Sequence, residues 1–315
     1  MDAADGLAGL LAAPRAQGAF LLRSVLDPPF AVAVRDGAPL TVVSMGRGTA
    51  WIVPEAAEPV ALGPGDVAIV RGPEPYTVAD RPDSPVQVVI HPGQFSTDPA
   101  GAPLCEEMDL GGRSWGGRPD GATVFLSGTY QLRGEVNGRL LRALPPVAVL
   151  PADAWSSPLP ALLGEEMDRD APGQEVVLDR LLDLLLITVL REWFARPEAA
   201  APRWYLAHGD PVVGRALRLL HGRPAEPWTV ASLAAEAGVS RAALARRFTE
   251  LVGEPPMAYL TGWRLDLAAD LLREPEATLA AVARRVGYGS PFALSSAFKR
   301  VRGVSPQQHR EYGTA

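Results

Sequence analysis

One pattern occurs twice in the last third of the chain, between residues 228 and 310. Each copy begins with apolar residues at helical spacing, breaks at a glycine (Gly238 or Gly287) and restarts at a serine (Ser240 or Ser290) as a second helix that carries basic residues. Glycine supplies the left-handed backbone of a sharp turn, and serine caps the helix that follows. The pattern therefore predicts two helix-turn-helix motifs, whose second helices are shaped to enter a DNA major groove.

This repeat and its surroundings resemble the DNA-binding domain of AraC/XylS-type transcriptional regulators, in which a linking helix joins two such motifs. The resemblance covers roughly the last hundred of the 315 residues. Matching segments are Gly238-Val239-Ser240, Leu244 with Phe248, Tyr259-Leu260, Gly287-Tyr288, Phe298-Lys299-Arg300 and Gly303-Val304-Ser305-Pro306. The resemblance implies a sequence-specific transcription regulator that binds double-stranded DNA, contacts RNA polymerase and is more often an activator than a repressor.

The helices expected to read DNA span residues 241–251 and 291–301, with a linking helix over 257–273. Leu244 and Phe248 lie four residues apart and belong to the core by that spacing, as do Leu294 and Phe298. The remaining faces are expected to meet DNA. Candidate contact residues are Ser240, Arg241, Ala242, Ala245, Arg246, Arg247, Ser290, Pro291, Phe292, Ser295, Ser296, Lys299 and Arg300.

Among these residues Arg246 is the best candidate for a base contact, because a bidentate arginine on guanine is the commonest specific pairing. Ala242 and Ala245 match positions that the family uses for base contact, but an alanine offers only apolar contact to a thymine methyl group. Ser296 stands where many relatives carry arginine, which weakens the base reading expected of the second motif. The cations assigned to phosphates or solvent are Arg241, Arg247, Lys299 and Arg300.

Charge is distributed unevenly along the chain. From His208 onward, 14 Lys and Arg stand against 10 Asp and Glu, a net charge of +4, whereas the first 207 residues carry 16 against 26, a net charge of −10. A basic module beside an acidic one favours nucleic-acid binding by the former, with solvated surface charge as the alternative. The single cysteine, the absence of a signal-like start and a longest apolar run of only about ten residues predict a cytoplasmic protein without membrane association.

The first half of the chain has a β texture. Seven short apolar runs with frequent Gly, Pro and Asp turns lie between residues 20 and 92, which predicts an antiparallel sandwich or small barrel. The turn Leu62-Gly-Pro-Gly-Asp66 and the opening at 18–26 resemble the cupin-type sensory domain of some AraC-like regulators, over roughly residues 7–130. Residues 93–121 are predicted to form a long loop, and 122–132 a strand pair broken at Gly128.

Helices are predicted at residues 2–18, 136–144, 158–167 and 174–195. The last is apolar on nearly every face, so it is buried by its own domain, or by that domain and a partner. The resemblance implies that this helix pairs two protomers into a homodimer, for which Leu181 and Leu185 are the candidate residues. The expected fold class is α+β multidomain: a cupin-like antiparallel β-barrel with a helical dimerisation segment (1–195), a linker (196–207) and an all-α double helix-turn-helix domain (208–315).

Candidate chemistry in the first half is sparse. Cupin enzymes hold a metal with a cluster of histidines, but His91 is the only histidine before His208. We therefore expect no metal, no cofactor and no enzymatic activity. An unknown small-molecule effector is expected in an apolar pocket lined by Trp51, Tyr76, Trp115 and Tyr130, each of which is alternatively a plain core residue.

Cys105 stands beside Glu106 and Glu107, whose charges are expected to raise the pKa of its thiol, so a thiol sensor is a minor alternative. Two further functions remain open from the sequence. One is a cupin-type enzyme with an appended helical domain. The other is an adaptor that uses its helices on a protein partner.

Overall fold

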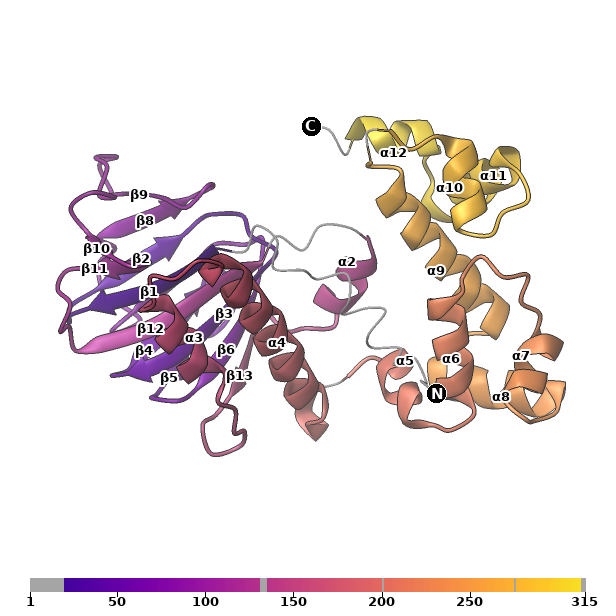
Figure 1. Ribbon diagram of the computed structural model, residues 1–315, viewed down its shortest axis with the longest axis horizontal. Helices are drawn as coiled ribbons and strands as arrows, with labels where there is room; N and C mark the ends of the chain where they lie inside the picture. Colours follow the sequence, from indigo (N-terminus) through magenta and orange to yellow (C-terminus); the bar gives the residue numbers. More distant parts are fainter. Residues whose placement is uncertain (1–19, 131–134, 200, 275, 313–315) are drawn as a thin grey trace. The chain divides into compact units, whose positions relative to one another are not determined.

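The computed structural model describes residues 20–130, 135–199, 201–274 and 276–312 (Figure 1). These residues form two compact units. The β unit comprises residues 20–130 and 141–199, and the helical unit comprises 135–140 and 201–312. The predicted helix at 2–18 lies outside the described residues. The expected fold class, a mainly β amino-terminal half and an all-helical carboxy-terminal half, is confirmed.

The β unit consists of two sheets. One sheet has seven strands in the order β10 (Asp109–Gly111), β11 (Ser114–Gly116), β1 (Phe20–Leu26), β12 (Thr123–Tyr130), β3 (Leu40–Arg47), β6 (Val67–Arg71) and β13 (Val147–Leu150). The other has six, in the order β5 (Val60–Leu62), β4 (Ala50–Pro54), β7 (Tyr76–Ala79), β2 (Ala31–Val34), β8 (Val88–His91) and β9 (Phe95–Thr97). A shared hydrophobic core receives side chains from both sheets, among them Val43 and Phe125 from one and Ile52 and Val78 from the other.

Two predictions for the end of this β region were wrong. Residues 93–121 are not one loop, because β9, β10 and β11 lie within them. Strand β12 is continuous and pairs through Gly128 with both β1 and β3. Gly128 allows the Leu182 side chain to lie close to the strand, because a Cβ at position 128 would lie 2.8 Å from a methyl carbon of Leu182.

Two helices accompany the seven-stranded sheet. Helix α4 (Gln174–Phe194) follows α3 (Leu159–Met167), as the periodicity predicts. The Tyr130 hydroxyl donates to the Leu182 carbonyl at 2.8 Å, which ties β12 to the middle of α4. Side chains alternate between the two faces of a strand. Gly128 and Tyr130 of β12 therefore face α4, while Phe125, Ser127 and Thr129 face the space between the sheets.

The helical unit contains two helix-turn-helix motifs joined by one helix. The first motif is α7 (Val230–Glu236) and α8 (Arg241–Val252); the second is α10 (Leu279–Arg285) and α11 (Pro291–Arg302). The linking helix α9 (Pro256–Leu271) contributes to a separate core in each motif. The other helices of this unit are α2 (Glu135–Leu141, which ends one residue beyond the unit), α5 (Arg203–Leu206), α6 (Val213–Gly222) and α12 (Pro306–Tyr312).

Local chemistry explains why the motifs turn where they do. Gly238 and Gly287 have φ of +69° and +82°, the left-handed conformation that glycine adopts at little cost. The hydroxyls of Ser240 and Ser290 then accept hydrogen bonds from backbone amides one turn into α8 and α11, at 3.2 and 3.1 Å. The expected linker at 196–207 contains short helical turns at Pro197–Ala199 and Arg203–Leu206. No helix among the described residues is long and apolar enough to cross a membrane.

Candidate functional site

Helix α8 exposes the face that the sequence assigns to DNA. Leu244 and Phe248 are fully buried, and both lie in the core of the first motif. The residues between them point outward: Arg241, Ala242 and Arg246 are exposed, and Ala245 is partly exposed. Among the described residues, no hydrogen bond or ion pair engages the Arg246 guanidinium. Its donors are therefore available to an external acceptor such as a guanine edge.

Arg247 differs from its neighbour Arg246. Its Nε and Nη2 donate to one carboxylate oxygen of Asp210, at 2.9 and 2.5 Å. The other Asp210 oxygen accepts from the backbone amides of Val212 and Val213, at the start of α6. The hydrogen bond from Arg247 is the main reason that the pKa of Asp210 lies below its usual value. Arg247 thus holds α8 against the start of α6, an arrangement that sequence reasoning missed because the two residues are 37 positions apart.

Helix α11 presents a different surface. Leu294 and Phe298 are fully buried, as their spacing predicts. Phe292 is 81 % exposed, the most exposed of the large apolar side chains in the described residues. Pro291 and Ser296 are also exposed, and Ser295 is partly exposed. Lys299 and Arg300 are exposed near the carboxy-terminal end of the helix.

The two motifs therefore offer unlike chemistry. The exposed face of α8 carries two available guanidinium groups, Arg241 and Arg246, beside small alanines. The corresponding part of α11 carries an aromatic ring and hydroxyl groups. A guanidinium group pairs preferentially with guanine. An apolar ring contacts the thymine methyl group, and a serine hydroxyl can hydrogen-bond with more than one kind of base.

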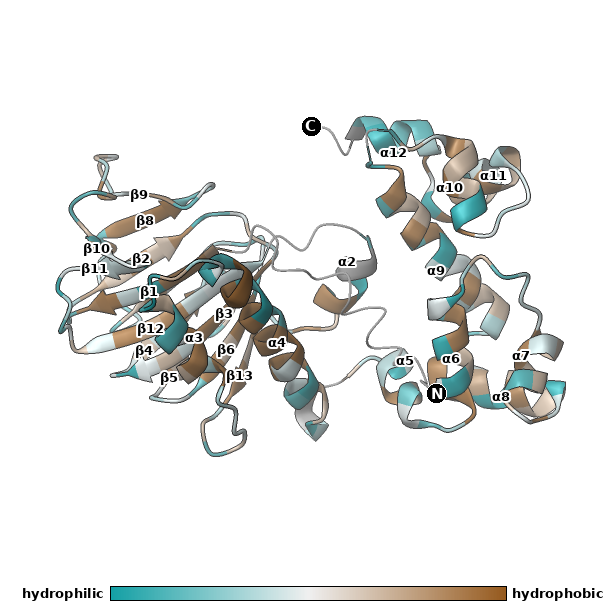
Figure 2. Ribbon diagram, viewed as in Figure 1, coloured by the Kyte–Doolittle hydropathy of each residue, from teal (hydrophilic) through white to brown (hydrophobic). Residues whose placement is uncertain are grey.

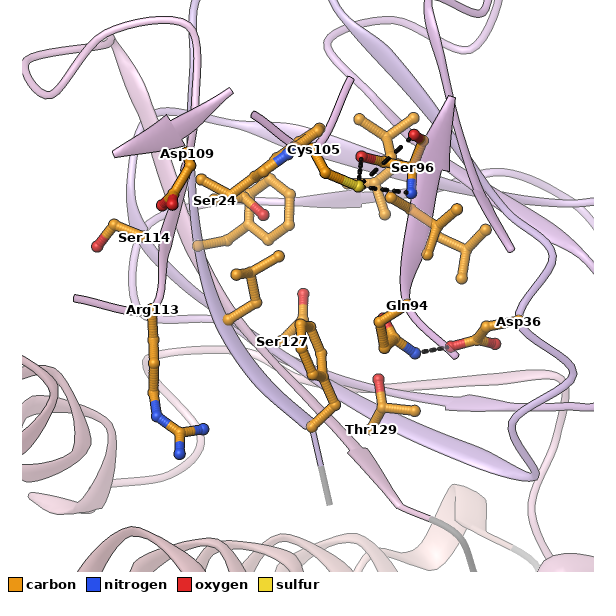
Figure 3. Close-up of a pocket in the computed structure, with 18 of the residues that line it drawn as sticks. Ser24, Asp36, Gln94, Ser96, Cys105, Asp109, Arg113, Ser114, Ser127 and Thr129 are labelled. Atoms are coloured by element: carbon orange, nitrogen blue, oxygen red, sulfur yellow. Dashed lines mark hydrogen bonds between the residues drawn. The ribbon is translucent and has the colours of Figure 1, made fainter. Parts of the chain in front are cut away.

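A second candidate site lies inside the β unit, between its two sheets (Figure 3). This cavity has a volume of about 190 Å³. Strand β12 supplies Phe125, Ser127 and Thr129, all from its inward face. Most of the cavity surface is apolar, but polar or charged side chains also line it: Ser24, Asp36, Gln94, Ser96, Cys105, Asp109, Arg113 and Ser114. Successive side chains of a strand point to opposite faces of the sheet, so the sequence of β12 could have indicated that its three lining residues share one face.

The four aromatic residues predicted for an effector pocket separate into two pairs. Tyr76 and Trp115 line the cavity. Burial raises the pKa of the Tyr76 hydroxyl, which therefore stays neutral at physiological pH. Trp51 and Tyr130 do not line it. Trp51 lies on β4 and is partly exposed, while Tyr130 faces α4 on the other side of the sheet.

Cys105 lines the same cavity, and the expected effect on its pKa had the wrong sign. The hydroxyl of Ser96 lies 3.2 Å from the sulfur, and the Ser96 backbone amide donates to the sulfur at 3.4 Å (Figure 3). These hydrogen bonds lower the pKa of the Cys105 thiol, and the opposing charge of Glu106 has a smaller effect. A hydrogen bond that favours the thiolate outweighs an exposed carboxylate, whose field water screens.

Helix α4 carries apolar residues on two faces (Figure 2). Leu185, one of the two residues predicted for dimerisation, is only 3 % exposed and packs within its own unit. Leu181 is partly exposed. It continues a stripe at helical spacing with Val177 and Leu184, which are 43 % and 50 % exposed. Within the described ranges, no group of three or more His, Cys, Asp or Glu side chains is placed to hold a metal.

Two family models match the chain. A family model described as "Cupin" matches residues 5–195, and one described as "Helix-turn-helix domain" matches residues 233–312. A Streptomyces lividans protein named as an AraC-like transcription regulator is 36% identical over 293 residues, which cover 90% of each chain. A Streptomyces antibioticus protein with the same name is 38% identical over 250 residues, 74% of this chain and 82% of that one.

Among solved structures, the DNA-binding domain of AdpA in complex with a target DNA is 35% identical and covers 33% of this chain and 92% of that one, with a TM-score of 0.31. The family rests on the sequence matches, which extend over both halves of the chain. The chain belongs to the AraC-like transcription regulators, with a cupin domain ahead of a helix-turn-helix DNA-binding domain.

Proposed function

We propose that this regulator reads double-stranded DNA with α8 and α11 together, as an activator that acts on RNA polymerase at promoters in the cytoplasm. The observation that best supports DNA binding is the pair of serine-capped helices, each with a buried Leu–Phe face and an exposed opposite face. Activation through RNA polymerase rests on the family resemblance. The first helix supplies base discrimination through Arg246. The second adds apolar contact through Phe292, with Lys299 and Arg300 on phosphates.

The cavity of the β unit is the proposed effector site. Its volume of about 190 Å³ is below the range of roughly 300–1,000 Å³ that drug-sized ligands occupy, so the effector is small. Apolar walls from both sheets and a neutral Tyr76 hydroxyl favour a largely apolar molecule with one or two hydrogen-bonding groups. Ser127 and Thr129 would orient those groups from β12.

We further propose a homodimer in which α4 of one protomer packs against α4 of its partner. The stripe formed by Val177, Leu181 and Leu184 supports this, because three partly exposed apolar side chains on one helix face lose contact with water when a second copy covers them. Leu184→Asp should shift the protein to monomers in light scattering. Leu206, an exposed leucine outside α4, provides the matched control Leu206→Asp.

DNA selection from a random pool tests the proposal as a whole. The full chain should enrich one sequence, and its affinity for that sequence should fall steeply as salt rises, because bound phosphates release counterions. A helical adaptor for a protein partner would show no such salt-dependent enrichment. A cupin-type enzyme would turn over its ligand, whereas an effector would be recovered unchanged after incubation with the protein.

A further inference from the structure

Helix α2 packs with the DNA-binding helices although it follows a strand of the β unit in sequence. Tyr130 ends β12, and Glu135 starts α2. Residues 135–140 nevertheless belong to the helical unit. The surface that receives them is one face of α9, the helix that links the two helix-turn-helix motifs.

Arg139 is the centre of this contact. Its guanidinium carbon lies 5.6 Å from the ring centroid of Tyr259 and 5.8 Å from that of Trp263. Its Nε donates to the carboxylate of Asp266 in a short hydrogen bond. Gly262 leaves room for the same group, since a Cβ there would lie 2.9 Å from an Arg139 Nη atom.

The carboxylate of Asp266 needs this partner. Asp266 is only 8 % exposed, and a buried charge is costly unless it is paired and hydrogen-bonded. Arg139 engages one of its oxygens, and Arg302 donates to the other at 2.5 Å. Removal of α2 would leave the carboxylate half satisfied and would take away the cation that lies over the rings of Tyr259 and Trp263.

A second charged residue extends the contact to the second motif. The Glu135 carboxylate pairs with Arg302, at the end of α11, at 3.3 Å and with Arg273 at 3.8 Å. The Glu135 backbone amide donates to Asp270 of α9 at 2.6 Å. Helix α2 thus touches Tyr259, which lies in the core of the first motif, and Arg302, which ends the recognition helix of the second.

We propose that this face of α9 is a docking surface for α2 and that docked α2 braces the two motifs at the separation needed to bind both halves of one DNA site. The proposal rests on the proposed function, because the brace matters only if both recognition helices bind DNA. Along the chain, α2 follows β12, the strand that carries Ser127 and Thr129 of the cavity.

The test compares Arg139→Glu with Arg142→Glu in the full chain. Both change the charge equally, but Arg142 is exposed and lies just beyond α2. Hydrogen exchange followed by mass spectrometry should show exchange over residues 135–141 at least about tenfold faster in Arg139→Glu than in wild type. Arg142→Glu should exchange at the wild-type rate. Arg139→Gln, which removes the charge without adding repulsion, should change exchange in the same direction. Equal exchange in Arg139→Gln and wild type would overturn the docking.

The bracing role has its own readout. With the DNA sequence that the wild-type chain selects, Arg139→Gln should bind at least about tenfold more weakly than Arg142→Gln. With DNA that keeps only the half read by the first motif, the two variants should bind equally. An equal loss on both DNAs, or no loss on either, would overturn the brace. If the wild-type chain selects no sequence, the proposed function fails, whereas the exchange experiment still decides the docking.

Discussion

Two adjacent arginines on α8 give the sharpest prediction, because the structure assigns them different tasks. Arg246 is exposed with no internal partner among the described residues, while Arg247 is held by Asp210. Replacement of Arg246 by alanine therefore removes contacts to DNA and little else. A bidentate arginine–guanine contact accounts for about 1–3 kcal/mol of discrimination, which corresponds to a roughly 5- to 150-fold loss of affinity for the preferred sequence.

Fluorescence anisotropy with the selected DNA and with variants of each base pair measures this loss. Arg246→Ala should weaken binding to the preferred sequence and should remove the preference at one base pair only. The control is Arg81→Ala, an equal charge change at a 66 % exposed side chain of the β unit. Arg247→Ala should retain the base preference and lower the free energy of unfolding instead. If Arg246→Ala and Arg81→Ala bind every DNA equally, Arg246 reads no base.

Three further predictions concern stability and reactivity. The pKa of Asp210 is lowered in the folded chain, so its stabilising contribution is complete above its unfolded pKa of about 3.9 and is lost as pH falls through the lower folded value. The free energy of unfolding of Asp210→Ala should lie about 0.5–3 kcal/mol below wild type at pH 7, because the hydrogen bonds from Arg247 and from the Val212 and Val213 amides are lost. It should approach the wild-type value in acid; a constant gap would contradict this. Ser96→Ala should raise the pKa of Cys105 and slow its alkylation at neutral pH, whereas an unchanged rate would show that Ser96 does not stabilise the thiolate. Gly128→Val should lower the melting temperature, because its side chain would overlap Leu182 at a cost of about 1–3 kcal/mol, and an unchanged melting temperature would mean that α4 is not held against β12.

The helical half was predictable in detail because its signals are local. Helix spacing places Leu244 and Phe248 on one face, and a glycine followed by a capping serine marks each turn. These signals involve residues close together in the sequence, so they can be recognised without knowledge of the tertiary structure. The residue pairs that assemble the helices are different. Arg247 and Asp210, or Arg139 and Asp266, are brought together only by the fold.

The β half shows where local signals fail. Glycine often marks a turn between strands, and on that ground the sequence predicts a break at Gly128, but an isolated glycine within a strand can instead mark close approach of another segment. The structure shows the alternative cause, the close approach of a helix packed against that strand. Only two of the four aromatic residues predicted for the effector pocket, Tyr76 and Trp115, line the cavity. Aromatic residues such as Trp51 and Tyr130 are common in any β core, and only the register of β12 tells which face lines the cavity.

Guanine-methylation and phosphate-ethylation interference on the selected DNA together test the central claim most directly. If α8 and α11 of one protomer enter successive major grooves, the methylated guanines and ethylated phosphates that block binding should fall into two clusters about 10 base pairs apart, on one face of the duplex. The cluster read by α8 should include a guanine whose effect disappears in Arg246→Ala. A single cluster for each protomer, or two clusters on opposite faces of the duplex, would contradict the proposed pairing of the two motifs on DNA.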